Sequence, residues 1–82
     1  MILRNMNVDV SRVFQLLDQR PFVPFDVDLN NGRRIPVTHP ENVVIFPYRE
    51  RVREILVYYP DRDDYSIIWP NGISALHVSK RD

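Results

Sequence analysis

The residues best suited to chemistry lie in a polar segment near the middle of the chain. This segment contains one tyrosine and three arginines, Tyr48, Arg49, Arg51 and Arg53. On an extended backbone the three guanidinium groups would point to one side, next to the aromatic ring, where they could hold phosphate or stack on a base. Glu50 and Glu54 partly neutralise the segment. A solvated hairpin tip is therefore the favoured interpretation, and a nucleic-acid contact is the alternative.

The two histidines of the chain raise the question of a metal site. His39 and His77, together with Glu41, would have to converge to form a site of two histidines and one carboxylate. Their spacing does not indicate convergence, because His39 lies in a turn and His77 alternates with the apolar Leu76 and Val78. We expect no metal ion and no other cofactor.

Other groups of polar residues also lack the setting that catalysis requires. Asp61, Asp63 and Asp64 resemble part of a calcium loop, but the glycine of that loop is missing. The serines show no nucleophile motif. Asp26 and Asp28 lie on the solvent-facing side of one strand, where a hydrated surface is a better explanation than acid–base catalysis. We therefore predict that the protein is not an enzyme.

Composition limits the class of protein and its surroundings. The 82 residues suffice for a single domain, 1–82, and eleven basic residues balance eleven acidic ones. No overall field therefore attracts nucleic acid or an anionic membrane. The chain has no cysteine, and neither a signal peptide nor a membrane span is expected, because the longest apolar run is only Ile55 to Tyr59. We expect a cytoplasmic protein that is not embedded in a membrane.

The first predicted element is an amphipathic helix over residues 9–19. Val10, Val13, Phe14 and Leu17 follow the helical period, and Pro21 ends the helix. A sheet is expected to fill residues 25–79.

The first predicted hairpin follows the helix. A three-residue loop from Asn30 to Gly32 places Val27 opposite Ile35 and Asp28 opposite Arg34. Pro36 requires an edge or a bulge, because it cannot donate a hydrogen bond to a neighbouring strand.

A second hairpin is predicted from Ile55 to Trp69. Pairing across a five-residue loop, Pro60 to Asp64, places Val57 opposite Ile67 and Ile55 opposite Trp69 on the core side. The other side then carries Leu56, Tyr58 and Ile68. The hairpin is apolar on both sides, so we expect the helix or a second subunit to cover these three residues.

Together these elements predict an α+β fold. The N-terminal helix packs on a strongly bent antiparallel meander of five to six strands, an order similar to small Sm-like and Src-homology-type barrels. No internal repeat is visible in the sequence.

Several short motifs resemble a known group of proteins. They are Arg-Pro-Phe-Val-Pro-Phe from Arg20 to Phe25, Asn-Gly-Arg from Asn31 to Arg33, and the His-Pro-Glu turn from His39 to Glu41. The pattern is similar to that of short uncharacterised bacterial proteins of planctomycete type. This resemblance implies no activity and no ligand.

The sequence thus favours a small non-enzymatic interaction or structural module that self-associates. A nucleic-acid-binding barrel that uses residues 48–53 is the alternative. The protein partner is not identified, and a homo-oligomer is the expected assembly.

Overall fold

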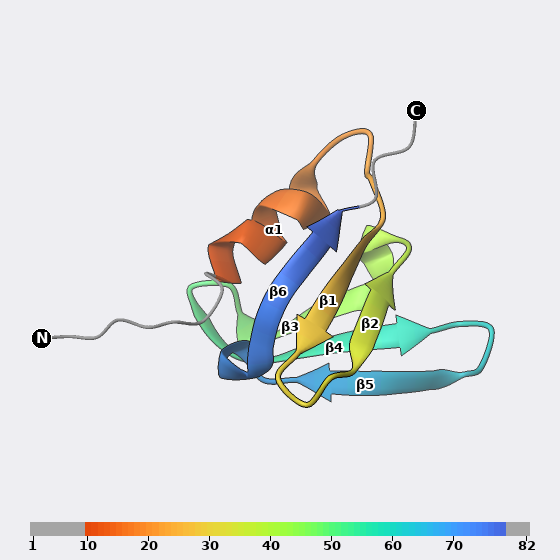
Figure 1. Cartoon of the computed structure of the whole chain (residues 1–82). Helices are drawn as coiled ribbons and strands as arrows, with labels where there is room; N and C mark the ends of the chain where they lie inside the picture. The colour runs from red at the N-terminus through yellow and green to blue at the C-terminus, as the bar shows by residue number, and fades with distance from the viewer. Residues whose placement is uncertain (1–9, 79–82) are drawn as a thin grey trace, which may run out of the picture.

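The alternating segments of the sequence form strands, and the apolar stripe near its start forms a helix (Figure 1). The structure is a computed structural model that describes residues 10–78. Its elements are α1 (Val10–Asp18), β1 (Phe25–Leu29), β2 (Arg34–Val37), β3 (Val43–Tyr48), β4 (Arg51–Tyr59), β5 (Asp64–Ile68) and β6 (Ile73–Val78). The α+β class is confirmed. Asp9 and Ser79, the outer limits of the predicted helix and sheet, lie with the rest of 1–9 and 79–82 outside the described residues.

The six described strands form two antiparallel sheets, not one meander. The orders are β2-β1-β6 and β3-β4-β5. The predicted meander is wrong at two places, since β3 pairs with β4 and not with β2, and β6 pairs with β1 and not with β5. Within residues 10–78 no strand pairing joins the two sheets, so the predicted barrel is not confirmed.

Both sheets have the same construction. In each half of the chain, a hairpin leads into a short 3-10 helix that begins with proline, and a single strand follows. The helices are η1 (Pro40–Asn42) and η2 (Pro70–Gly72). Each single strand pairs with the hairpin of the other half, β3 with β4 and β6 with β1. The two halves of the chain therefore share one topology, in which β1 of the first half corresponds to β4 of the second half.

The core lies between the two sheets and is closed by α1. Its buried residues are Val13, Leu16, Leu17, Phe25, Val27, Ile35, Val37, Ile55, Val57, Tyr59, Ile68 and Ile73. Val13, Leu16 and Leu17 place α1 against the inner sides of the sheets. Figure 1 shows α1 on the side of the molecule opposite β4 and β5. Of the two covers expected for the outer side of the second hairpin, α1 is therefore ruled out, and a second subunit stays a prediction.

The first hairpin has the predicted register. Val27 lies opposite Ile35 and Asp28 opposite Arg34, across a loop of three residues. The Gly32 amide donates to the Leu29 carbonyl at 2.9 Å, and Gly32 has a φ of 90°. A residue with a Cβ avoids this conformation, so the loop depends on glycine. β2, which contains Pro36, is an edge strand as the proline requires.

The two glycines of the chain offer a matched test of this loop. Gly32→Ala should lower the free energy of unfolding by roughly 1 kcal/mol or more, because alanine disfavours positive φ. Gly72→Ala should be nearly neutral, since a Cβ at Gly72 meets no atom within 4 Å and Gly72 does not have a positive φ. Urea unfolding of both variants measures the difference. Equal stability of the two variants would contradict the observed loop conformation.

The second hairpin departs from the predicted register by one residue. Ile55 lies opposite Ile68 and Val57 opposite Ser66, in place of Trp69 and Ile67. The loop is one residue shorter than predicted, because Asp63 adopts the left-handed conformation at a φ of 52°. A shift of one residue moves every side chain of a strand to the opposite face.

This shift changes the predicted interface. Ile68 is buried in the core at 2% exposure and is not part of any surface. Leu56 and Tyr58 do face outward, as predicted, with Tyr58 40% exposed. Ile67 and Trp69, which were predicted to be in the core, join them on the outside.

Candidate functional site

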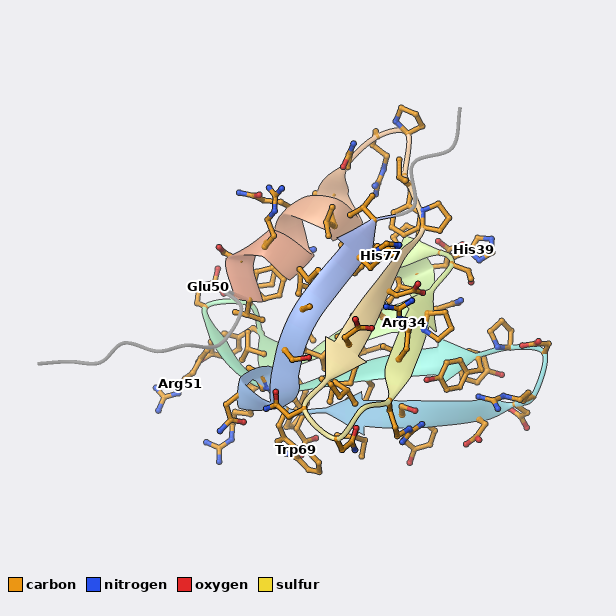
Figure 2. The ribbon with its side chains drawn as sticks, in the orientation of Figure 1. Arg34, His39, Glu50, Arg51, Trp69 and His77 are labelled. Carbon is orange, nitrogen blue, oxygen red and sulfur yellow. The ribbon has the colours of Figure 1, made fainter. Side chains whose placement is uncertain are left out.

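The side of sheet β3-β4-β5 that faces away from the core is covered with large apolar side chains. We call this side the outer face. Its apolar residues are Val44, Phe46, Tyr48, Leu56, Tyr58, Tyr65, Ile67 and Trp69. These residues alternate with core residues such as Ile55 and Val57, so their side chains point outward. Figure 2 shows Trp69 on the side of the sheet turned away from β1 and β6.

The strand register arranges the outer face in rows. Across the sheet these rows are Phe46 and Glu54; then Val44, Leu56 and Ile67; then Tyr58 and Tyr65. Trp69 directly follows β5 at the end of the face that carries the first row. An aliphatic row therefore lies between two rows that carry aromatic side chains. Leu56, on the middle strand, is at the centre of the face.

Most of this face is open to solvent. Apart from the half-buried Leu56, every apolar residue of the outer face is between 40% and 57% exposed. Single exposed apolar residues are ordinary on protein surfaces, but contiguous patches of this kind mark interaction sites.

The other sheet shows that the fold does not require an apolar outer side. On sheet β2-β1-β6 the corresponding positions are polar or small: Asp26, Asp28, Arg34, Pro36, Ala75 and His77. Arg34 donates to both carboxylate oxygens of Asp28, at 2.6 and 3.0 Å, and these bonds lower the pKa of Asp28. Two sheets of the same construction thus differ in the chemistry of their outer sides, and only one of them has a polar surface suited to water.

The segment from Tyr48 to Glu54 contains the tip of the hairpin formed by β3 and β4. Tyr48 lies opposite Arg51, and Arg49 and Glu50 form the turn. Arg49 donates to both oxygens of Asp18 at 2.7 and 2.9 Å. Its guanidinium carbon lies 4.9 Å from the centroid of the Phe14 ring. Arg49 therefore connects the hairpin tip to α1, and its charge is compensated by Asp18.

The other predicted contact residues of the tip point elsewhere. In Figure 2, Glu50 lies near α1, whereas Arg51 extends away from it. Arg51 lies opposite Tyr48 of the outer face. Arg53 occupies an irregularity in β4, where the register shifts between Phe46 and Pro47. The structure thus places Tyr48, Arg51 and Arg53 at one end of the outer face and separates Arg49 from them.

The ion pair between Arg49 and Asp18 should make the stability of the protein depend on pH. Hydrogen bonds from Arg49 lower the pKa of Asp18 below its ordinary value of 3.8. A carboxylate with a lowered pKa stabilises the fold at neutral pH, and this contribution is lost as the pH falls through the lowered pKa. Arg49→Met should keep the packing on Phe14 but lose the ion pair. Urea unfolding should show Arg49→Met less stable than the unmodified protein at pH 7, with a gap that closes in acid; a gap independent of pH would argue against this role.

The remaining candidates from the sequence do not assemble into a site. His39 lies in the turn before η1, with Nδ1 3.1 Å from the Thr38 hydroxyl oxygen, and His77 lies on the polar side of β6 opposite Asp26. Among residues 10–78 no three histidine or carboxylate side chains converge to hold a metal ion. Asp61 and Asp63 belong to the β4–β5 turn, where Asp63 accepts a hydrogen bond from the Tyr58 hydroxyl at 3.0 Å.

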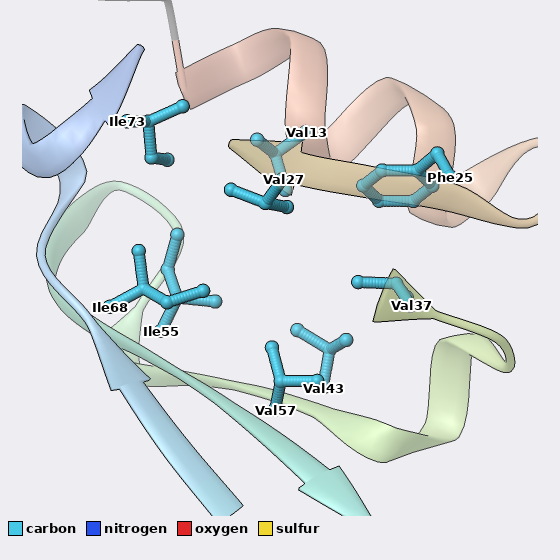
Figure 3. Close-up of a pocket in the computed structure, with 9 residues that line it drawn as sticks. All are labelled: Val13, Phe25, Val27, Val37, Val43, Ile55, Val57, Ile68 and Ile73. Atoms are coloured by element: carbon cyan, nitrogen blue, oxygen red, sulfur yellow. The ribbon is translucent and has the colours of Figure 1, made fainter. Parts of the chain in front are cut away.

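The structure also contains a small void in its core, drawn in Figure 3. Its walls are apolar: Val13, Phe25, Val27, Val37, Val43, Ile55, Val57, Ile68 and Ile73. With no polar partner for a ligand or a water, the void is a packing feature. Two open grooves border β5, and one of them reaches Trp69 from the Asn30 side. They extend the outer face toward the first hairpin.

Sequence reasoning missed most of the outer face. Val44, Phe46, Tyr65, Ile67 and Trp69 were not identified as surface residues. A four-residue loop in the second hairpin, with an aspartate in the left-handed conformation, is the signal that would have placed the last three outside.

Comparisons with protein-family profiles, curated proteins and solved structures find no significant match to this chain. The resemblance to planctomycete-type proteins stays a prediction.

Along residues 10–78 the single helix is too short and too polar to cross a bilayer. The outer face is the feature that bears on function.

Proposed function

We propose that this protein is a small non-enzymatic interaction module that self-associates through the outer face. The observation that carries the proposal is the contrast between the two sheets. Equivalent positions hold ionised pairs on one sheet and exposed aromatic and aliphatic side chains on the other. The strands of a sheet that packs on the core with one side ordinarily alternate apolar and polar residues. A second apolar side therefore indicates that another surface packs against it. The lack of cysteine supports a cytoplasmic location.

The size of the face suits an interface. Its aromatic side chains, Phe46, Tyr48, Tyr58, Tyr65 and Trp69, are 40% to 57% exposed. At about 150–250 Å² for each aromatic side chain, they offer on the order of 500 Å² of surface. Val44, Leu56 and Ile67 add to it. The sum exceeds what most monomers expose in one patch and approaches the roughly 800 Å² that each partner contributes to a standard interface.

The pattern of the face suits a second copy of the chain. A two-fold interface brings the same patch of both subunits together. Here an aliphatic row lies between two aromatic-bearing rows, so rotation about Leu56 places aromatic rows on aromatic rows. Two such sheets would pack face to face at about 10 Å, as in a β-sandwich.

Sedimentation equilibrium tests this proposal. The mass should rise above the 9.8 kDa of one chain as the protein concentration increases. Trp69, the only tryptophan, provides a second readout, because its emission should shift to the blue as it becomes buried. A constant monomer mass up to roughly 1 mM, where even a free energy of about 4 kcal/mol produces association, would refute self-association.

A single-stranded nucleic acid is the second candidate. The observation in its favour is that Tyr48 lies opposite Arg51, while Phe46 and Trp69 are also exposed on the outer face. Bases stack on such rings. Two observations count against it: the ion pair of Arg49 with Asp18, and the balanced net charge. Oligonucleotide titration of Trp69 fluorescence tests it. Binding should weaken steeply with added salt, and no quenching at low salt would exclude this candidate.

A further inference from the structure

We propose that the two copies stack their outer faces with the β4 strands antiparallel, so that the Arg51 end of each copy lies against the acidic turn of the other. This inference rests on the self-association proposed above and adds the orientation of the partner. It follows from where the charges lie along β4.

The two ends of β4 carry opposite charge on the outer side. Arg51 and Arg53 lie at its start. Asp61 and Asp63 lie in the turn that follows its end, and Asp63 is held on the outer side by the Tyr58 hydroxyl. At about 3.3 Å per residue, the first and last of the nine residues of β4 lie roughly 26 Å apart. The charges at its two ends are therefore too far apart to neutralise each other within one chain.

Within residues 10–78, the neighbouring charged side chains form no ion pair with the groups at the two ends of β4. Among the described residues, neither Arg51 nor Arg53 has an ion-pair partner. At the acidic end, the Arg62 guanidinium stacks 4.6 Å from the centroid of Tyr59, a core residue, and so lies away from the outer face. In the part of the chain that the structure describes, Glu54 is the single acid within the face itself, opposite Phe46.

If the two sheets pack with their strands aligned, as in most β-sandwiches, two-fold symmetry leaves two orientations. A two-fold axis that lies between the sheets and runs along β4 makes the two strands parallel and brings like-charged ends together. An axis that crosses β4 makes the strands antiparallel and brings opposite charges together. The apolar rows fit either arrangement, so the charged ends decide between them, as charges at the rim of interfaces commonly set orientation.

The spacing along β4 agrees with the antiparallel choice. Leu56 is at the centre of the face, with Arg51 five residues before it and Asp61 five residues after it. If Leu56 packs on Leu56 of the partner copy, Arg51 falls opposite the turn that holds Asp61. The contact occurs twice, once at each end of the dimer.

Single charge reversals test the orientation. Arg51→Glu and Asp61→Arg should each weaken self-association by roughly tenfold or more at low salt, because each places like charges together twice. Mixed in equal amounts, the two variants should form a heterodimer with an affinity close to that of the unmodified protein, since both contacts are again opposite in sign. Arg12→Glu, on α1, is the matched control and should leave association unchanged.

Sedimentation equilibrium of each variant and of the mixture gives a distinct result for each failure. Circular dichroism checks that the variants fold. If the unmodified protein dimerises and the reversals have no effect, the orientation is wrong while self-association stands. If both reversals weaken association and the mixture does not recover it, the pairing of Arg51 with the acidic turn is wrong. If the unmodified protein stays monomeric, self-association itself fails, and the orientation with it.

Discussion

Ile68→Ala is expected to lower the free energy of unfolding by about 2–5 kcal/mol, whereas Ile67→Ala should cost far less in the monomer. Ile68 is 2% exposed and lies opposite Ile55 in the core, next to Ile73 and Val57 at the small void. Removing its side chain would enlarge the void and lose its contacts. Ile67 is 40% exposed and points to the outer face, so its truncation leaves no enclosed cavity.

Urea unfolding at low protein concentration, where association does not contribute, measures both values. The two substitutions are chemically identical and adjacent, so the comparison depends only on which side of β5 faces the core. A larger loss for Ile67→Ala than for Ile68→Ala would show that the second hairpin has the register expected from the sequence.

Leu56→Asp should weaken self-association by about 100-fold or more and leave the monomer folded. It places in the centre of the outer face the residue type that the corresponding strand β1 carries at Asp26. A carboxylate buried there without a partner would lose its hydration, and central interface residues commonly account for 2 kcal/mol or more, or roughly a factor of 30 or more, even when only truncated.

Ala75→Asp is the control for this experiment. Ala75 is exposed on the outer side of the other sheet, so the added charge is the same but lies away from the proposed interface. Sedimentation equilibrium should show loss of the dimer for Leu56→Asp and no change for Ala75→Asp. Equal association of both variants would move the interface away from the outer face.

Local rules predicted the first hairpin correctly. Asn31 and Gly32 have strong turn preferences, and the loop of three residues is the one that brings the apolar residues of both strands to one side. The amphipathic helix followed from its spacing in the same way. In both cases the information lies within a few residues of the element.

The second hairpin was predicted less well, because its residues do not reveal which side is the core. Leu56, Tyr58 and Ile67 are as apolar as Ile55, Val57 and Ile68. Both registers therefore bury similar surface locally, and the choice depends on the shape of the core that the other sheet and α1 present. The predicted interface depended on the same choice of register. The wrong register assigned Ile68, a core residue, to that interface.

The sequence by itself determined the class of the fold, the helix, the first hairpin and the presence of more apolar surface than one core requires. Only the tertiary structure decided that β6 pairs with β1 and that α1 packs on the core sides of the sheets. It also decided that Arg49 forms an ion pair with Asp18. Strand order and coverage depend on contacts between segments far apart in the chain, such as β1 with β6. Their energies come from three-dimensional packing and are not encoded in the local spacing of residues.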